Sequence, residues 1–416
     1  MTERLVVIGN GMAAGRALER LIESAPNRYL ITIFNAEPRV NYDRIMLSPL
    51  LSGEKQFDDI VIHNDAWYAR NGITLHKGCR VTGIDRATRT VTGAGGTIEP
   101  YDKLVIATGS VPIIIPVPGN ALQGVVTFRD LDDVDAMKRA AETGGRAVVI
   151  GGGLLGLEAA AGLQRQGMEV SVVHLMPTLM ERQLDAAAGE LLAQTLRARG
   201  IEVLTAANTR HILGDARVTG LELTDGRVLP ADLIVMAVGI RPSVELAKQA
   251  GLAVNRGVVT DTQMRTSDSN VFALGECAEV GGQCFGLVAP LYDMASVLAA
   301  QLAGDSTASF SPAATSTRLK VTGISLYSAG DFAAGEDRED IVLRDDAAGV
   351  YKRIVLRDDK VIGAVLYGET SDGPWFFDLM KAQAAAQGIR EMLIFGSAFE
   401  TTPPLEPYGG RCSVAG

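Results

Sequence analysis

Two glycine-rich segments of this sequence have the composition and spacing to hold nucleotide phosphates. They read LVVIGNGMAAG from Leu5 to Gly15 and AVVIGGGLLG from Ala147 to Gly156. In such a segment the first glycine permits a tight turn, the second lets a pyrophosphate approach the backbone, and a small third residue lets the following helix pack closely. The N–H groups that begin this helix then face the phosphates. The residues in these positions are Gly9, Gly11 and Ala14 in the first copy and Gly151, Gly153 and Gly156 in the second.

Each copy stands between the elements that must position it. An apolar strand comes first, an amphipathic helix follows, and a second strand returns at Tyr29 to Phe34 or at Glu169 to Val173. In the second helix we expect Leu155, Ala159 and Leu163 to share the buried face. A single GxGxxG also arises in ordinary glycine-rich turns, but two copies with strands on both sides predict two βαβ units. We therefore expect the chain to bind two dinucleotides at once.

Length and composition indicate a globular protein of more than one domain. A chain of 416 residues exceeds one hydrophobic core, and 47% hydrophobic residues with 46 glycines suit an α/β fold. No charged and apolar leader precedes the first strand, so we expect no signal peptide. The most apolar run, Val111 to Pro118, contains three prolines, so we expect no membrane span. The net charge of −10 argues against nucleic acid as a partner, and it suits either a basic protein partner or simple solubility.

The four cysteines lack the spacing of a metal or redox site. Cys277 and Cys284 stand seven residues apart, which matches neither a CxxC pair nor a zinc or iron–sulfur motif. We therefore predict no metal site, and we expect reduced structural thiols in a cytoplasmic protein.

Three further segments join the first fingerprint as candidates for nucleotide binding. They read FNAEPRVNYDRIMLS from Phe34 to Ser48, YDKLVIATGSVP from Tyr101 to Pro112 and TSDSNVFALGECA from Thr266 to Ala278. Glu37 lies just beyond a strand and can accept both hydroxyls of an adenosine ribose, although an ordinary surface glutamate is the alternative. The other two segments are apolar strands that end in a glycine turn.

With these segments the chain resembles the FAD-dependent pyridine nucleotide oxidoreductase superfamily. The resemblance implies an α/β fold with two Rossmann-like domains, an FAD-binding domain into which an NAD-binding domain is inserted, and a small α+β C-terminal domain. In the superfamily an aspartate usually follows the glycine of the third segment, whereas this chain has Glu276, which reaches one methylene further. Val81 matches the position whose backbone meets the adenine. The implied FAD set is Gly9, Gly11, Ala14, Glu37, Arg44, Ser48, Val81, Thr108, Gly109, Gly275 and Glu276.

The resemblance also implies a site for the second dinucleotide, NADH or NADPH. Glu158, on the first helical turn after the second fingerprint, takes the place of a glutamate that faces the nicotinamide; the alternative is a solvent-facing glutamate favoured by the helix dipole. His174 stands where NAD enzymes usually present an acidic residue, and no basic pair for a 2′-phosphate follows it, which favours NADH. The implied set is Gly151, Gly153, Leu155, Gly156, Glu158, His174 and Gly239.

The implied chemistry is hydride transfer from NAD(P)H to FAD and then electron transfer to a protein partner, which needs no general base. The catalytic candidates are Glu158 and Arg44. Related ferredoxin and rubredoxin reductases carry a lysine after the Leu-Ser of the YxRxxLS segment, where this chain has Pro49. Arg44 or Lys55 is therefore the candidate positive charge for reduced flavin. No cysteine precedes Cys79, which argues against an oxidase or peroxidase.

A narrower resemblance extends from about residue 4 to residue 400. The segments NYDRIMLS, VVHLMPTLMERQLD, MAVGIRPS, GECAEVGGQCFGLVAPLYDMA and VLYGETSDGPWFF are similar to the flavin portion of NAD(P)H nitrite reductase large subunits and to assimilatory nitrate reductase electron-transfer subunits. Nitrite reductase large subunits continue into iron–sulfur and sirohaem modules, whereas the matching segments here end before such modules, so we expect this chain to lack the site where nitrite is reduced. This implies an electron-input component of nitrite or nitrate assimilation that serves a separate redox partner, an iron–sulfur, sirohaem or molybdenum reductase component. The alternatives are a general ferredoxin or rubredoxin-type reductase and a non-enzymatic NADH-sensing flavoprotein.

The predicted layout has three domains. They are an FAD-binding domain at residues 1–111 and 243–311, an NAD(P)-binding domain at residues 112–242, and a C-terminal α+β domain at residues 312–416. In the last domain we expect strands at Arg318 to Ile324, Gly349 to Leu356 and Lys360 to Leu366 and a helix from Pro374 to Gln387. For the acidic piece from Asp331 to Asp346 we expect a solvated hairpin, and the alternative is a docking site. For Trp375 the two alternatives are a position over the flavin and a place in the core. The C-terminal domain is expected either to cover the flavin or to form a homodimer interface.

Overall fold

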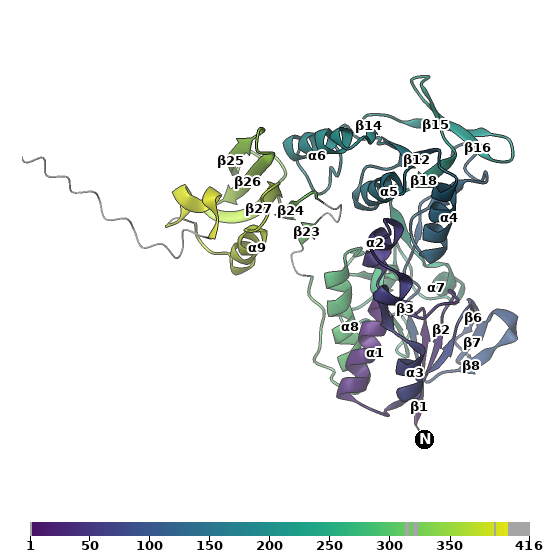
Figure 1. Cartoon of the computed structure of the whole chain (residues 1–416). Helices are drawn as coiled ribbons and strands as arrows, with labels where there is room; N and C mark the ends of the chain where they lie inside the picture. The colour runs from purple at the N-terminus through teal and green to yellow at the C-terminus, as the bar shows by residue number, and fades with distance from the viewer. Residues whose placement is uncertain (1, 313–315, 319–322, 387, 398–416) are drawn as a thin grey trace, which may run out of the picture. The chain divides into compact units, whose positions relative to one another are not determined.

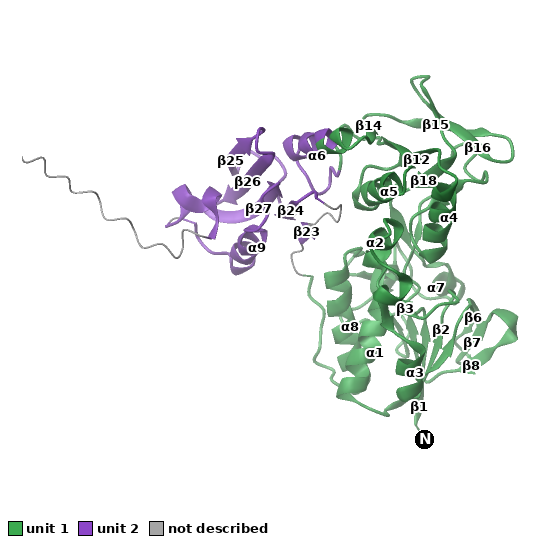
Figure 2. Ribbon diagram, viewed as in Figure 1, with its two compact units in different colours: residues 1–179, 195–315 green, residues 180–194, 316–416 purple. Residues whose placement is uncertain are grey.

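The computed structural model describes residues 2–312, 316–318, 323–386 and 388–397 (Figure 1). The chain divides into two compact units, which Figure 2 colours separately. The first unit contains residues 1–179 and 195–315, and the second contains residues 180–194 and 316–416.

The first fingerprint follows the central strand of a parallel sheet with the strand order β21-β9-β1-β2-β5. Side chains of β1 alternate between two apolar clusters: Leu5 and Val7 pack with the helices α1 and α8, whereas Val6 and Ile8 pack on the other face. This two-sided burial explains why the strand is a continuous apolar run. The bounds are β1 (Glu3–Ile8), β2 (Tyr29–Phe34), β5 (Thr74–His76), β9 (Lys103–Ile106), β21 (Val271–Ala273), α1 (Met12–Ser24) and α8 (Val288–Ala303).

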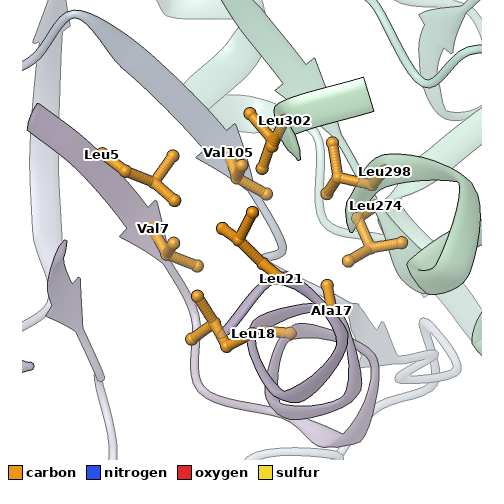
Figure 3. A pocket seen from close by; sticks show the side chains of 10 residues that line it. Leu5, Val7, Ala17, Leu18, Leu21, Val105, Leu274, Leu298 and Leu302 are labelled. Carbon is orange, nitrogen blue, oxygen red and sulfur yellow. The ribbon is translucent and has the colours of Figure 1, made fainter. Parts of the chain in front are cut away.

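A cavity of about 10 Å³ remains between this sheet and the helices α1 and α8 (Figure 3). Every residue that lines it is apolar, and Leu18, Leu21 and Leu298 are among them. A space of this size without polar partners does not hold an ordered water. It is therefore a packing gap in the core and not a ligand site.

The second fingerprint follows the central strand of a second parallel sheet, β11-β18-β12-β13-β14. The buried stripe of its helix, α5, contains Gly156, Ala159 and Leu163, spaced by three and four residues. The prediction that Leu155 shares this face is wrong: Leu155 is 40% exposed, because it lies in the first turn at the margin of the stripe. The bounds are β11 (Val125–Thr127), β12 (Arg146–Ile150), β13 (Glu169–Val173), β14 (Glu202–Leu204), β18 (Leu233–Met236), α4 (Leu131–Glu142) and α5 (Leu154–Arg165).

The chain runs between the two parallel sheets through an antiparallel pair, β10 (Ser110–Pro112) with β19 (Ile240–Pro242). The predicted domain boundaries fall at these two strands, although the domain division itself stays a prediction. The other elements of the first unit are β3 (Asn41–Tyr42), β4 (Val61–His63), β6 (Val81–Asp85), β7 (Thr90–Gly93), β8 (Ile98–Pro100), β15 (Thr209–Gly214), β16 (Val218–Leu223), β17 (Val228–Pro230), β20 (Val258–Thr260), β22 (Ala278–Val280), α2 (Leu47–Leu51), α3 (Asp65–Arg70), α7 (Glu245–Gln249) and the 3-10 turns η1 (Arg44–Met46), η2 (Phe57–Ile60), η3 (Ala94–Gly96) and η4 (Gly275–Cys277). Among the described residues, no helix has the length and apolar character that crossing a bilayer requires.

The second unit is built on an antiparallel sheet, β23-β24-β27-β26-β25, with α9 packed on it. Two predicted strands are confirmed as β26 and β27, but the strand expected at Arg318 to Ile324 falls partly outside the described residues, and β24 follows it. The acidic segment does not form a hairpin of its own, because its second half pairs with β26 as the edge strand β25. The helix ends before Gln383, which takes a left-handed conformation, instead of continuing to Gln387, which lies outside the described residues. The bounds are β23 (Ser316–Arg318), β24 (Leu326–Gly330), β25 (Glu339–Asp345), β26 (Val350–Arg357), β27 (Lys360–Tyr367), α9 (Gly373–Ala382) and η5 (Arg390–Phe395), and α6 (Ala186–Ala198) begins in this unit.

Hydrogen bonds explain why residues 180–194 belong to the second unit. The Asp185 carboxylate accepts a hydrogen bond from the Tyr351 hydroxyl at 2.6 Å and one from Arg353 at 3.2 Å. The Tyr367 hydroxyl donates to the Leu191 carbonyl at 3.4 Å. These long-range pairs bind a segment of the predicted NAD(P)-binding domain to the antiparallel sheet, which the sequence did not indicate.

Candidate functional site

The loop of the first fingerprint leaves open space at one glycine only. Gly9 has φ +109°, and a methyl group on it would overlap the carbonyl oxygen of Ala107, which follows β9. Gly11 is the N-cap of α1, carries no side-chain cap, and a methyl group on it would meet no protein atom within 4 Å. Ala14 is buried in the helix. The first helical N–H groups are thus available for an anion beside an open backbone.

The second fingerprint repeats this arrangement. Gly151 has φ +122° and lies against the carbonyl of Ala237, which follows β18. A methyl group on Gly156 would overlap the carbonyl oxygen of Gly151, so close packing of α5 requires a glycine there. Gly153, the uncapped N-cap of α5, again has no protein atom within 4 Å of an added methyl group. Both loops therefore leave open backbone at Gly11 and Gly153, as the approach of a pyrophosphate would require.

Glu37 lies in a polar cluster beyond β2. The Tyr42 hydroxyl donates to its carboxylate at 2.7 Å, and Arg44 forms an ion pair with it. Burial raises the pKa of Tyr42, so this hydroxyl keeps its proton and acts as a donor. A carboxylate has about four acceptor sites. Glu37 can therefore also accept ribose hydroxyls. Arg44 lies beside Glu37, which is compatible with a role in cofactor binding, and the catalytic role of Arg44 stays a prediction.

Glu276 lies in a second cluster that the sequence did not indicate in full. Its carboxylate accepts a hydrogen bond from the Ser110 hydroxyl at 2.6 Å and pairs with Arg129. Gly109 lies beside this pair, since a methyl group on it would be 3.7 Å from the Arg129 guanidinium. Arg129 was missed because it follows a short strand without any motif, and the only local signal is the helix N-cap Asp130 directly after it. The longer glutamate thus reaches an arginine instead of standing alone.

The turns that carry Thr108 and Gly275 lie near the first fingerprint. The Thr108 hydroxyl donates to the Ser243 carbonyl at 2.8 Å, which fixes the turn after β9. Gly275 has φ +87°, and a methyl group on it would be 3.4 Å from the Cβ of Ala13. Val81 is half-buried at the start of β6. The turns that carry Thr108 and Gly275 therefore lie at the carboxyl-terminal edge of the first sheet, as the first fingerprint does.

Ser48 and Glu158 connect the residues assigned to the two dinucleotides. Ser48 lies on α2 in the FAD set, and Glu158 lies on α5 in the nicotinamide set. The Ser48 hydroxyl donates to the Glu158 carboxylate, and the two residues are only 6% and 9% exposed. Glu158 is therefore not the solvent-facing glutamate of the alternative interpretation.

His174 is buried and holds the second fingerprint loop. Its Nδ1 accepts the Gly152 N–H at 3.0 Å, and its Nε2 lies 3.1 Å from the Thr178 carbonyl oxygen. An N–H cannot accept and a carbonyl cannot donate, so the ring is the neutral tautomer with its proton on Nε2. Both ring nitrogens therefore have partners within the protein, and the contact of His174 with a ribose stays a prediction. The next residues, Leu175 and Met176, are exposed.

The remaining candidates lie on turns or in the second unit. Gly239, with φ +122°, lies between β18 and β19 beside Ile113. Lys55 is half-buried after α2. Trp375 is part of the second unit, where its ring packs 4.9 Å from that of Phe376. Trp375 therefore packs against the core of its own unit. The approach of Trp375 to a flavin stays a prediction.

Comparisons with known proteins agree with this geometry. Residues 3–304 match the family model for pyridine nucleotide-disulphide oxidoreductases, and residues 316–384 match that for the C-terminal domain of rubredoxin NAD+ reductases. The chain is 47% identical over 382 residues to a nitrite reductase [NAD(P)H] of Bacillus subtilis, covering 92% of this chain and 48% of that protein. It is 41% identical over 408 residues to an assimilatory nitrate reductase electron transfer subunit of the same organism, covering 97% and 53%. The chain thus spans about half the length of these curated relatives.

Solved structures show the same fold. The covalent complex of putidaredoxin reductase with putidaredoxin matches with a TM-score of 0.82 at 26% identity over 92% of this chain and 94% of that chain. The NADH:rubredoxin oxidoreductase of Clostridium acetobutylicum matches with a TM-score of 0.79 at 27% identity over 95% and 99%. The predicted fold class, two Rossmann-like parts with a small C-terminal domain, is confirmed. The chain belongs to the pyridine nucleotide-disulphide oxidoreductase family.

Proposed function

We propose that the chain is an NAD(P)H-oxidising FAD flavoprotein that passes electrons to a separate redox partner, as the electron-input component of nitrite or nitrate assimilation. The observation that carries this proposal is the bond between Ser48 and Glu158. It joins the segment assigned to FAD with the helix assigned to the nicotinamide inside one compact unit. Two cofactor sites joined in this way suit direct transfer of a reducing equivalent.

FAD fits the residues around the first fingerprint. Gly11 leaves the opening for the pyrophosphate, Glu37 keeps acceptor capacity for a ribose, and the pair of Glu276 and Arg129 supplies both charge signs nearby. When bound, FAD supplies the chemistry of a hydride acceptor that can release electrons one at a time. The protein's own contribution is to hold the two cofactors in register and to supply fixed dipoles.

The nicotinamide dinucleotide fits the second loop. Gly153 leaves the opening, and the buried Glu158 is the group that would hold the carboxamide. Leu155, two residues after Gly153, presents an exposed apolar side chain. We favour NADH over NADPH because the exposed Leu175 and Met176 follow β13, where a 2′-phosphate would need a cation.

The comparisons support two candidate kinds of partner. The names of the two Bacillus relatives, a nitrite reductase and a nitrate reductase electron transfer subunit, support a partner that reduces nitrite or nitrate. We propose an iron–sulfur, sirohaem or molybdenum reductase component for it. The match of residues 316–384 to a rubredoxin reductase domain supports the second candidate, a general ferredoxin or rubredoxin reductase. A cytoplasmic location and a homodimer belong to the proposal as well, and the three described cysteines, which are free thiols, are compatible with a reducing compartment.

Anaerobic stopped-flow mixing tests the proposal. We expect NADH to reduce the bound flavin rapidly, and the reduced protein to be reoxidised by a nitrite-reducing or nitrate-reducing component. Reoxidation by ferredoxin or rubredoxin alone would favour the second candidate. Slow reduction with a long-lived charge-transfer complex and no turnover with any acceptor would contradict both and indicate an NADH sensor.

A further inference from the structure

The contact between α2 and α5 points to a role for Ser48 that differs from its assignment to the FAD set. We propose that Ser48 is a positioning residue, which fixes the carboxylate of Glu158 for the nicotinamide of NAD(P)H. This inference rests on the proposed function. Ser48 directly precedes Pro49, and related reductases carry a lysine at the position of Pro49.

Burial makes the bond between Ser48 and Glu158 important for the orientation of the carboxylate. A buried carboxylate that loses a donor forfeits a large part of its stabilisation, because water cannot replace the donor. The Ser48 backbone is itself fixed, since its carbonyl accepts the Ser52 N–H at 2.9 Å. The donor thus sits on a rigid helix, as a positioning group requires.

The rest of the contact prevents the two helices from sliding. A methyl group on Gly162 would be 2.8 Å from the Leu51 side chain, so the helices approach as closely as a glycine allows. The Gln166 amide donates to the Leu51 carbonyl at 2.9 Å, and Glu54 pairs with Arg165. Ser48, Leu51 and Glu54 follow one another at intervals of three, and Glu158, Gly162 and Gln166 at intervals of four. These residues therefore share one face of each segment.

The chemistry of a hydroxyl separates this role from that of a flavin ligand. A serine hydroxyl has one hydrogen, and Ser48 donates it to Glu158. Only its lone pairs remain for a cofactor. Ser48 therefore acts on the nicotinamide side through Glu158, whether or not FAD also touches it.

The test uses the full-length holoprotein and three variants. Ser48→Ala removes the donor, and Ser48→Thr retains it. Ser52→Ala is the matched control, because the Ser52 hydroxyl donates to the Pro49 carbonyl within the same segment. We expect Ser48→Ala to keep its FAD and to lower kcat/KM for NADH about tenfold or more, the effect of one hydrogen bond to a charged group. Ser48→Thr should recover to within about threefold, and Ser52→Ala should match the wild type.

A second readout does not depend on activity. Hydrogen exchange of the amides in the first two turns of α5, measured without nicotinamide nucleotide, should quicken in Ser48→Ala but not in Ser52→Ala. Unchanged NADH kinetics and unchanged exchange in Ser48→Ala would overturn the inference, and loss of FAD from this variant would overturn it in favour of a flavin ligand. If neither nucleotide reduces the wild-type protein, the proposed function fails, and the exchange measurement alone then decides whether Ser48 holds Glu158.

Discussion

Gly153→Ala should separate nicotinamide binding from both folding and FAD binding. Gly153 has φ −87° and ψ −176°, an extended conformation that alanine adopts readily. No protein atom lies within 4 Å of the added methyl group. The only group that the methyl can meet is therefore a ligand that approaches the backbone, which is the pyrophosphate in our account.

The expected magnitudes differ for folding and for binding. Alanine is a poorer N-cap than glycine by roughly 0.5–1 kcal/mol, but it also reduces the freedom of the unfolded chain by about 0.4–1 kcal/mol. The free energy of unfolding should thus change by less than ~1 kcal/mol. The loss of a charge-assisted hydrogen bond to phosphate costs about 1.5–3 kcal/mol, which weakens NADH binding roughly 10-fold to 100-fold.

Titration of flavin absorbance and calorimetric binding of NAD+ measure this effect. Gly11→Ala is the mirror control, because it places a methyl group in the first opening and should release FAD while the fold persists. Gly156→Ala is the opposite control, because its methyl group overlaps the Gly151 carbonyl and should destabilise the protein itself. Wild-type affinity for NADH in Gly153→Ala would refute the phosphate-site assignment, and loss of FAD from it would show that the two sites are exchanged.

Two further predictions concern stability. Burial lowers the pKa of His63 below its ordinary 6.5 although Glu19 lies 2.7 Å from its Nε2, so the unfolded chain takes up the proton first as the pH falls through 6.5. The contribution of His63 to the free energy of unfolding should therefore be complete above this pH and decrease below it. In urea unfolding between about pH 7.5 and 5.5, His63→Gln should make this decrease smaller. An unchanged slope of the free energy against pH would contradict the reasoning. Asp185→Asn weakens the acceptor for Tyr351 and Arg353, so the free energy of unfolding of the second unit should decrease by about 1–3 kcal/mol. In calorimetry this unit should melt at a lower temperature while the FAD content stays constant. An unchanged transition would show that the cluster is not stabilising.

The sequence predicts those features of the site that a short segment determines by itself. Gly9 and Gly151 must turn directly after an apolar strand, and this local geometry gives the same pattern in both copies. The parallel sheets follow from the same segments, because a strand, a helix and a returning strand form a right-handed unit. The two fingerprints and the fold class were therefore readable without a structure.

Pairings between distant residues were not readable. Ser48 and Glu158 are 110 residues apart, and Arg129 and Glu276 are 147 apart, so each bond depends on how distant helices or turns meet in the fold. The position of His174 at the end of β13 was predictable, but the hydrogen bond that its ring accepts from the Gly152 N–H was not. Long-range geometry of this kind leaves no periodic pattern in the chain.

Anaerobic titration of the purified protein with NADH tests the central claim most directly. The account predicts a yellow protein that holds FAD in stoichiometric amount, whose flavin absorbance bleaches as NADH is added and returns when an electron acceptor is supplied. A colourless protein that takes up no FAD, or a bound flavin that neither NADH nor NADPH reduces, would contradict it.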